Sequence, residues 1–347
     1  MGSRFRAFLL GLLLAPGFAQ GATFPIFSKA DEPPVPVGAP VDPLAAVVED
    51  LQKLPGAKNF RLERLGSAPA VLQEFNSGRS LAIGSTFKLY ILAALSEGRR
   101  PWDEVLPIRA DWTSFPSGSL HRARPGSPMT VWGLAALMIS QSDNTATDHL
   151  LHHAGRAQVE GVMAPSGHSR PQDNRPMLST LELFKLKADE PLRRRFLAAD
   201  EAGRRLLLDS EVAALPRQSV EDALGNWTKP IAIETAEWFA SAADLCRLMD
   251  HFRRRNDPTV LDILAINPGL RVDPARFPYV GYKGGSEPGV VNMTFLLRSR
   301  DGVSYALTAG WNDPASELDM DRFFALVQRA LDAVPTGTPV PSPAAAR

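Results

Sequence analysis

In residues 82–95, AIGSTFKLYILAAL, a small polar turn leads directly into an apolar run. Gly84 precedes this run, so the pattern predicts a helix that begins near Ser85 and carries Lys88 one turn later. Residues three apart share a helical face, which places the Lys88 amine near the Ser85 hydroxyl. A serine hydroxyl becomes a nucleophile when a base takes its proton, and a lysine with a lowered pKa is such a base. Alone, S-x-x-K is a pattern that many chains contain by chance.

A second motif, Ser142-Asp143-Asn144, follows a helix-like segment at 129–139 and opens another helix toward Leu151. One interpretation is structural, because all three residue types favour the N-cap of a helix. In the functional interpretation, the Ser142 hydroxyl relays a proton and the Asn144 amide orients a lysine or a substrate.

The third motif, Lys283-Gly284-Gly285-Ser286, stands at the end of a strand expected at 278–282. Paired glycines allow a backbone or a substrate to approach an edge strand closely. A cation there can hold a substrate carboxylate or depress the pKa of a neighbouring lysine. The plain alternative is a strand that ends in a turn.

Taken in this order, the three motifs resemble the S-x-x-K, S-D-N and K-T-G set of class A β-lactamases and of the wider group of penicillin-recognising serine hydrolases. The resemblance extends from about residue 42 to residue 333 and includes MTVWGLAALMISQSDNTATDHLL. It implies that Ser85 is the acylated nucleophile, that Lys88 is its base or proton relay, and that Ser142 passes a proton to the leaving group.

The same resemblance implies substrate binding by four further residues, which are Asn144, Lys283, Gly285 and Ser286. It also implies that the backbone N–H groups of Ser85 and Ser286 form an oxyanion hole.

Two features depart from the family pattern. The third motif lacks the middle threonine, although its lysine and final glycine remain. In addition, class A β-lactamases carry a glutamate in an E-x-x-L-N loop, where it activates the deacylating water. The matching residues 174–179, NRPMLS, place Arg175 at the glutamate position and Ser179 at the asparagine position. A cation cannot act as this base.

Three acids remain as candidate substitutes for that glutamate, namely Asp173, Glu182 and Glu234. Glu182 also fits the face of a helix. Without such a base, a β-lactam would acylate Ser85 and the acyl group would then be removed slowly.

Around the motifs, hydrophobic periodicity predicts an α+β fold. A helix is expected from Asp42 and Pro43, and another from Ser316. Strands are expected at 59–65, 71–76, 278–282, 290–298 and 303–311, with Asp301-Gly302 as a hairpin turn and a mostly helical block at 85–229. This order predicts one antiparallel sheet covered by terminal helices, beside an all-helical lobe. The family resemblance implies the same three-layer β-lactamase fold, with one hydrolase domain at 42–333.

The stretch between the second and third motifs is longer than in class A enzymes. The excess fits residues 188–229, which are charged and helical, and predicts an inserted helical cap near the cleft. Its arginines at 193–195 and 204–205 are interpreted as a solvated face, or alternatively as a surface that attracts an anionic substrate.

Composition excludes several functional classes. The chain has 347 residues, with 38 basic and 38 acidic side chains, and so lacks the basic excess of a nucleic-acid-binding protein. The single cysteine, Cys246, excludes an internal disulfide and a cysteine-based zinc cluster, and its apolar surroundings predict a core residue. His149 and His153 share a helical face, but no third ligand accompanies them, so we expect neither a metal nor another cofactor.

The two ends of the chain are not expected to belong to the fold. Residues 1–21 have the layout of a secretory signal peptide, with Arg4 and Arg6, an apolar run at 7–15 and small residues at Ala19 and Gly21. The run is too short to span a bilayer, and a retained signal anchor is the alternative. Residues 22–41 form a Pro-rich lead-in, and the tail at 334–347 is expected to be disordered. We therefore expect a periplasmic or secreted protein with no membrane span in its mature form.

These observations predict an exported, monomeric serine hydrolase that acts on a small molecule through a Ser85 acyl-enzyme. Its substrate would be a β-lactam, or a related ester or amide. Two alternatives remain open, an esterase or D,D-peptidase-like hydrolase and a non-catalytic penicillin-binding sensor that is stably acylated. A G-x-S-x-G motif is absent from the sequence, which argues against an α/β-hydrolase triad.

Overall fold

The computed structural model of the chain describes residues 42–225 and 227–336. The expected signal peptide, the Pro-rich lead-in and residues 337–347 of the expected tail lie outside these ranges. Within them, every helix is too short or too polar to cross a membrane.

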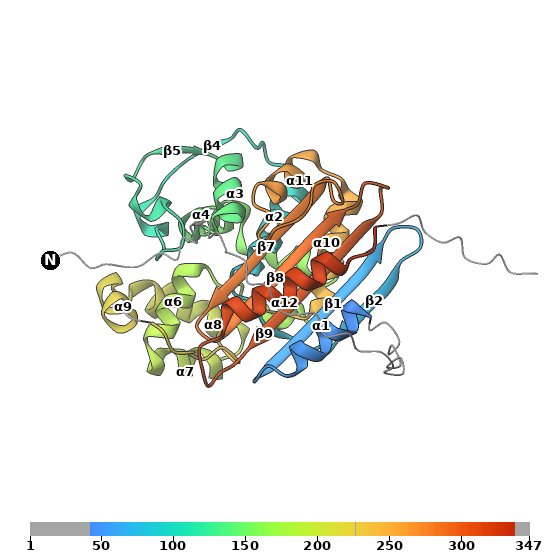
Figure 1. The fold of residues 1–347 in the computed structure, drawn as a ribbon. Helices are drawn as coiled ribbons and strands as arrows, with labels where there is room; N and C mark the ends of the chain where they lie inside the picture. The colour runs from blue at the N-terminus through green and yellow to red at the C-terminus, as the bar shows by residue number, and fades with distance from the viewer. Residues whose placement is uncertain (1–41, 226, 337–347) are drawn as a thin grey trace, which may run out of the picture. The chain divides into compact units, whose positions relative to one another are not determined.

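A five-stranded antiparallel sheet has the strand order β2-β1-β9-β8-β7 (Figure 1). Its strands are β1 (Ala57–Leu65), β2 (Ala70–Phe75), β7 (Tyr279–Glu287), β8 (Val290–Arg298) and β9 (Ser304–Asn312). β9 pairs with both β1 and β8, so the N-terminal hairpin joins the C-terminal strands in one sheet. This confirms the predicted sheet. One boundary was wrong, because β7 does not end at Tyr282 but runs through the whole third motif.

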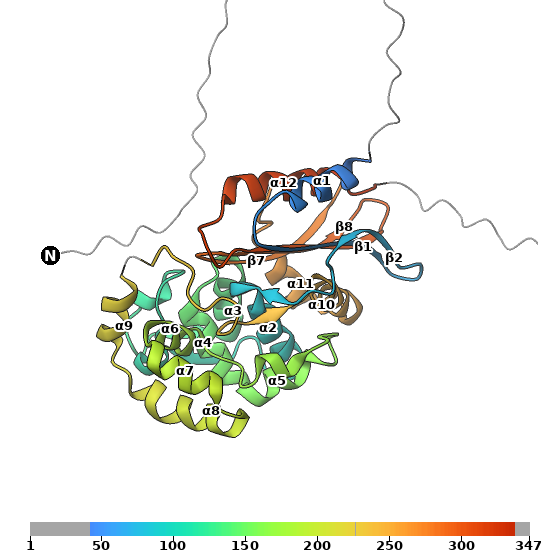
Figure 2. The same cartoon turned by 90° about the horizontal axis from the view of Figure 1, so that it is seen from below.

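Helices α1 (Pro43–Gln52) and α12 (Met320–Ala333) cover one face of this sheet (Figure 2). Each carries an apolar stripe at helical spacing, which is the pattern that buries one face of a helix. The stripes pack with Phe60, Phe295 and Trp311 of the sheet in one hydrophobic core. α12 begins four residues later than predicted from Ser316, because Asp319 caps it by accepting a hydrogen bond from the Arg322 N–H at 3.0 Å.

Helices α10 (Ala242–Arg255) and α11 (Pro258–Ala265) pack on the opposite face (Figure 2). They belong to a second core that includes Leu296 and Ala306 of the sheet and most of the helical lobe. Cys246 is buried in α10, as expected, and burial raises the pKa of its thiol to about 12. The thiol is therefore a core group and not a reactive one.

The helical lobe is built around α2 (Lys88–Glu97), which is buried on nearly every side. The helices that pack against it are α3 (Val131–Ser140), α4 (Asn144–Ala154) and α5 (Arg156–Met163), while α6 (Thr180–Ala188) packs on α4. A helix that is apolar all round can be stable only in the interior of a protein. This explains the continuous apolar run at 89–95 that follows Ser85.

The stretch expected to hold the helical insertion contains α7 (Glu190–Ala198), α8 (Glu201–Leu207) and α9 (Arg217–Leu224), with a π-helical turn at Leu208–Val212. The arginines of this stretch contact groups within it or next to it. Arg193 donates to the backbone carbonyls of Leu186 and Lys187, and Arg195 pairs with Glu211 at the surface. These contacts favour the interpretation of the arginine runs as a structural, solvated face.

Two small ladders were not predicted. β3 (Leu81–Ala82) pairs with β6 (Phe239–Ala240), and β4 (Val105–Pro107) pairs with β5 (Pro128–Thr130). Strands of two or three residues are too short to show an alternating pattern. The first ladder matters for the site, because β3 leads directly into the turn that carries Ser85.

Candidate active site

Ser85 lies on a short 3-10 turn, η1 (Gly84–Phe87), which leads into α2. The turn is held from both sides. Asn312 accepts a hydrogen bond from the Ala82 N–H at 2.8 Å and donates one to its carbonyl at 3.0 Å, while Phe87 stacks on Trp238 with ring centroids 3.7 Å apart. Ser85 therefore precedes the α-helix instead of beginning it, and its neighbours fix its backbone.

Lys88 is fully buried at the start of α2. Its amine donates hydrogen bonds to the Ser142 carbonyl at 2.6 Å, to Asn144 Oδ1 at 2.7 Å and to Ser142 Oγ at 3.2 Å. No hydrogen bond between Lys88 and the Ser85 hydroxyl is present in the described structure. The three-residue spacing predicted a direct contact between the Lys88 amine and the Ser85 hydroxyl. In the structure, the amine contacts the S-D-N motif instead.

The environment of Lys88 favours its uncharged form. Burial lowers the pKa of Lys88 to about 7, although the negative charges of Asp143 and Asp148 oppose this shift. A substantial fraction of the amine is therefore neutral near pH 7 and able to accept a proton.

The S-D-N motif forms the junction between α3 and α4. Asp143 is the N-cap of α4 and accepts hydrogen bonds from three backbone N–H groups at 2.6 to 2.9 Å. Ser142 has a φ of +56°, which is uncommon for a residue other than glycine, and its carbonyl accepts from Ser117 Oγ at 2.5 Å. The structural interpretation therefore holds for Asp143, and the functional interpretation stays a prediction. Asp143 caps a helix, while Ser142 and Asn144 contact Lys88.

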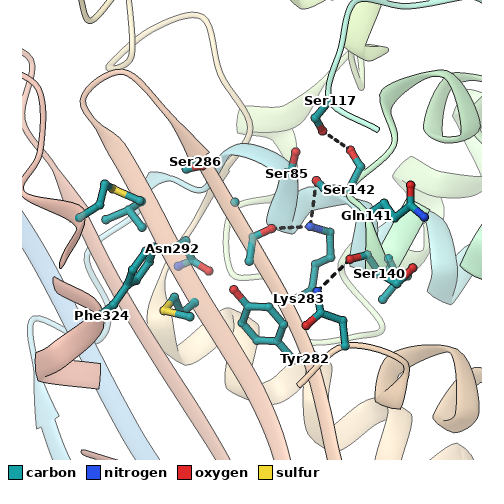
Figure 3. Close-up of a pocket in the computed structure, with 17 residues that line it drawn as sticks. Ser85, Ser117, Ser140, Gln141, Ser142, Tyr282, Lys283, Ser286, Asn292 and Phe324 are labelled. Atoms are coloured by element: carbon teal, nitrogen blue, oxygen red, sulfur yellow. Dashed lines mark hydrogen bonds between the residues drawn. The ribbon is translucent and has the colours of Figure 1, made fainter. Parts of the chain in front are cut away.

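Lys283 reaches the same hydroxyl from the sheet. Its amine donates to Ser142 Oγ at 3.1 Å and to the Gly284 carbonyl (Figure 3). Burial and the neighbouring Lys88 lower the pKa of Lys283 well below its usual range. The Ser142 hydroxyl thus lies between two buried amines, an arrangement through which a proton can move.

β7 and η1 approach each other at Gly285. A Cβ at this position would lie 2.1 Å from the Ile83 carbonyl oxygen and 2.6 Å from the Ser85 nitrogen, so the contact requires glycine. A Cβ on Gly84 would lie 3.1 Å from the Ser286 nitrogen. The backbone nitrogens of Ser85 and Ser286 therefore lie near one another, as an oxyanion hole requires.

The missing threonine of the third motif has a local explanation. A Cβ on Gly284 would lie 2.1 Å from the Tyr282 hydroxyl oxygen, so this hydroxyl occupies the space of a larger side chain. The Tyr282 ring is fixed against Phe295, with centroids 4.8 Å apart. Tyr282 lines the same cavity as Lys283 (Figure 3).

Ser85 lies in the walls of two cavities of the described structure. The first, of about 320 Å³, is lined by Ser85, Ser142 and Lys283, together with apolar side chains such as Met293 and Phe324 (Figure 3). The second, of about 190 Å³, is lined by Ser85 and by residues of α6 and the end of β7. Its other residues include Asn144, Phe184, Trp227, Trp238, Ser286 and Glu287. Ser85 can therefore be reached from two sides.

Arg175, which occupies the position of the deacylating glutamate, lines neither of these cavities. It contributes to a separate small cavity with Glu237 and Trp238. The stretch before it is tied to β6, because Asn174 exchanges hydrogen bonds of 2.8 and 2.9 Å with the backbone of Phe239. No base of the usual kind is thus present at this point of the loop.

The three acids considered as substitutes also lie elsewhere. Asp173 pairs with Arg170 at 2.8 Å. Glu182 forms a capping box at the start of α6 and pairs with Arg156 at 2.7 Å. Glu234 lines a fourth cavity, which does not include Ser85. The sequence analysis overlooked Glu287, although extending the alternation of β7 beyond Lys283 and Gly285 would have placed it on their face.

His149 and His153 do not form the metal site that their spacing permits. Both ring nitrogens of His149 contact the backbone, at Arg109 N and Thr145 O, with distances of 2.8 and 2.7 Å. His153 lies 3.5 Å from a carboxylate oxygen of Glu104. The described part of the chain contains no group of three or more side chains that could hold a metal ion.

Comparisons with known proteins identify the fold and the family. No curated protein matches the chain. Among solved structures, a β-lactamase from Sphaerobacter thermophilus is 20% identical, with a TM-score of 0.55 over 85% of this chain and 98% of that one. A Francisella tularensis β-lactamase is 11% identical, with a TM-score of 0.57 over 84% and 97%. A point mutant of PBP-A is 17% identical, with a TM-score of 0.55 over 85% and 96%.

At these identities the solved structures establish the fold alone. The family itself is established by sequence, because a model described as the beta-lactamase enzyme family matches residues 48–329. The matched range includes the turn of Ser85, the S-D-N junction and the whole of β7. The chain therefore belongs to the β-lactamase enzyme family.

Proposed function

We propose that the chain is an exported serine hydrolase that opens a β-lactam, or a related ester or amide, through an acyl-enzyme on Ser85. The observation that carries the proposal is the Ser142 hydroxyl, which lies between the buried amines of Lys88 and Lys283 beside a cavity that includes Ser85. The structure of the PBP-A mutant is described as an acyl-enzyme complex with penicillin G, which supports acylation in this fold.

In the proposed acylation, Ser85 Oγ attacks the substrate carbonyl carbon and its proton passes to the neutral Lys88 amine. The N–H groups of Ser85 and Ser286 stabilise the charge that develops on the carbonyl oxygen. Losing one such donor typically costs about 10²–10³ in rate. Ser142 then gives its proton to the leaving nitrogen or oxygen and takes one from Lys88, so the scissile bond breaks and Lys88 is neutral again.

The remaining predicted residues would position the substrate. Lys283 would meet a substrate carboxylate, and Asn144, which accepts from Lys88 at 2.7 Å, would orient both the lysine and the substrate. Gly285 permits β7 to approach Ser85, and Ser286 lines both cavities. All of these residues come from one chain, which fits a monomer.

Export rests on the sequence of residues 1–21, which has the order of a secretory signal, and places the protein in the periplasm or outside the cell. N-terminal sequencing of the protein recovered from the periplasm or medium would test it. A protein that keeps Arg4 and Arg6 and stays with the membrane would indicate a retained anchor instead.

The activity is tested by recording the intact mass of the protein during incubation with a chromogenic cephalosporin, with Ser85→Ala as the control. An adduct that appears and clears while substrate is hydrolysed, and that is absent in Ser85→Ala, is the expected result. An adduct that persists would favour a penicillin-binding sensor or an esterase, and hydrolysis of ester substrates would separate these two. A folded protein that forms no adduct would exclude the Ser85 mechanism for β-lactams.

A further inference from the structure

A carboxylate lies in the wall of the second Ser85 cavity. Glu287 is the one acidic residue among the described residues that line this space of about 190 Å³, and Ser85, Asn144 and Ser286 line it too. An acyl group on Ser85 would therefore have a carboxylate near it, in the wall of the cavity that α6 also lines.

The strand itself directs Glu287 toward this face. Side chains alternate along a strand, so Lys283, Gly285 and Glu287 all point to the same side of β7. Lys283 contacts the S-D-N motif and Gly285 contacts the turn of Ser85, so Glu287 continues the row beyond the nucleophile. Its side chain is only 9% exposed.

A lysine of α6 holds Glu287 in place. The Lys187 amine contacts Glu287 Oε1 and also lies 2.6 Å from Glu237 Oε1, and the side chains of Lys187 and Glu237 have no exposed surface. The Trp227 ring lies 5.1 Å from the same amine. Two carboxylates therefore share one buried cation.

This arrangement makes Glu287 more basic than an exposed glutamate. Burial and the charge of Glu237 raise the pKa of Glu287 well above its usual range, although Lys187 opposes the shift. For Lys187, burial is outweighed by Glu237 and Glu287, which raise its pKa and keep it charged. Lys187 is thus the cation of the cluster, and Glu287 is its carboxyl group in the Ser85 cavity.

We propose that Glu287 is the general base that activates the deacylating water, in place of the glutamate that the loop lacks. This inference rests on the proposed function. Water would add to the acyl carbonyl carbon and give one proton to the Glu287 carboxylate. The bond from that carbon to Ser85 Oγ then breaks, and Oγ takes the proton back. A free serine hydroxyl, the Glu287 carboxylate and the released carboxylic acid remain.

The test is Glu287→Gln, followed by intact mass and by stopped-flow absorbance with a chromogenic cephalosporin. We expect acylation at a rate close to that of the unmodified protein and one equivalent of released chromophore. The adduct should then clear more slowly by about 10²–10⁴-fold, which is the usual contribution of a general base. Retained acylation shows in the same experiment that the variant is folded.

The matched control is Glu237→Gln, which removes the other carboxylate from Lys187 but does not alter a residue of the Ser85 cavity. It should still clear its adduct. Loss of the Glu237 charge should lower the pKa of Glu287, so that Glu287 stays ionised at a lower pH. The deacylation rate of Glu237→Gln should therefore begin to fall at a lower pH than that of the unmodified protein. If the effect of Glu287→Gln came only from breaking the ion cluster, both variants would lose deacylation to the same extent.

Glu287→Asp keeps the carboxylate and covers the case in which the glutamine variant does not fold. Its adduct should clear faster than the adduct of Glu287→Gln. If the glutamine variant does not fold, the deacylation rate of Glu287→Asp should still rise with pH. A Glu287→Gln protein that acylates and clears at the original rate would overturn the inference and leave the proposed function intact. An unmodified protein whose adduct persists would also overturn it. A folded protein that never acylates would remove the proposed function itself.

Discussion

At the level of single residues, the proposed acylation depends on the protonation state of Lys88. Its pKa is lowered to about 7 by burial, and the active form is the neutral amine. The acylation rate should therefore rise about tenfold per pH unit below pH 7 and level off above it. The negative charges of Asp143 and Asp148 raise this pKa and so oppose the effect of burial.

Intact-mass measurement of adduct formation in single-turnover conditions, from about pH 5 to pH 9, would check this profile. Lys88→Met should slow acylation by about 10²–10⁴-fold and remove the dependence near pH 7. A rate in the unmodified protein that does not change across this range would show that Lys88 is not the base.

At the scale of elements, the approach of β7 to η1 determines the geometry of the site. Gly285→Ala would place a methyl group against the Ile83 carbonyl and the Ser85 nitrogen, at distances that neither backbone can accept. We expect a loss of about 1–3 kcal/mol in the free energy of unfolding, as for an overpacked core. Acylation of Ser85 should fall by more than about 10²-fold, because the oxyanion donors separate.

Urea denaturation and the intact-mass assay would measure these two effects. Gly78→Ala is the matched control, since a Cβ on Gly78 would have no atom within 4 Å and this glycine does not have a positive φ. The control should acylate normally. Equal behaviour of the two variants would mean that β7 and η1 can separate without consequence.

The elements also show what the sequence could and could not predict. The five strands of the sheet were predictable because each is six or nine residues long and because turn residues such as Asp301-Gly302 separate neighbouring strands. β3 and β6 were not, since a two-residue strand has no period and depends on its tertiary partner. The end of β7 was missed because the paired glycines resemble a turn, whereas here they allow the contacts with Tyr282 and η1.

The candidate site was predictable to a similar degree. The motifs that contain Ser85, Ser142 and Lys283 were recognisable because each consists of a few consecutive residues. The structure brings Ser142 and Lys283 into contact. Glu287 was hidden, because its role depends on Lys187 and Glu237, which are 100 and 50 residues away along the chain. A buried cluster of this kind has no local signal. Arg175 could be recognised as a departure, but its position outside the Ser85 cavities could not.

At the scale of the whole described fold, the site joins two hydrophobic cores. One core lies between the sheet and the helices α1 and α12, and the other extends from the sheet through α10 into the helical lobe. Ser85 and Ser142 come from the lobe and Lys283 from the sheet, so the contact of both lysines with Ser142 requires the two parts to be packed together. The sheet also joins both ends of the folded chain through β1 and β9.

Because each part buries a face that the other covers, we expect the folded domain to unfold in a single transition. Far-ultraviolet circular dichroism, tryptophan fluorescence and the capacity of Ser85 to be acylated should give the same midpoint in urea. Trp311 packs in the sheet core, and the other five of the six tryptophans lie outside the sheet, among them Trp238, which stacks on Phe87. The fluorescence that Trp311→Phe loses therefore comes from the sheet, and the fluorescence that it keeps comes from outside the sheet. A fluorescence midpoint of Trp311→Phe that differs from its own midpoint by circular dichroism would show that sheet and lobe unfold separately. The geometry of the site would then be lost when the less stable of the two parts, the sheet or the lobe, unfolds.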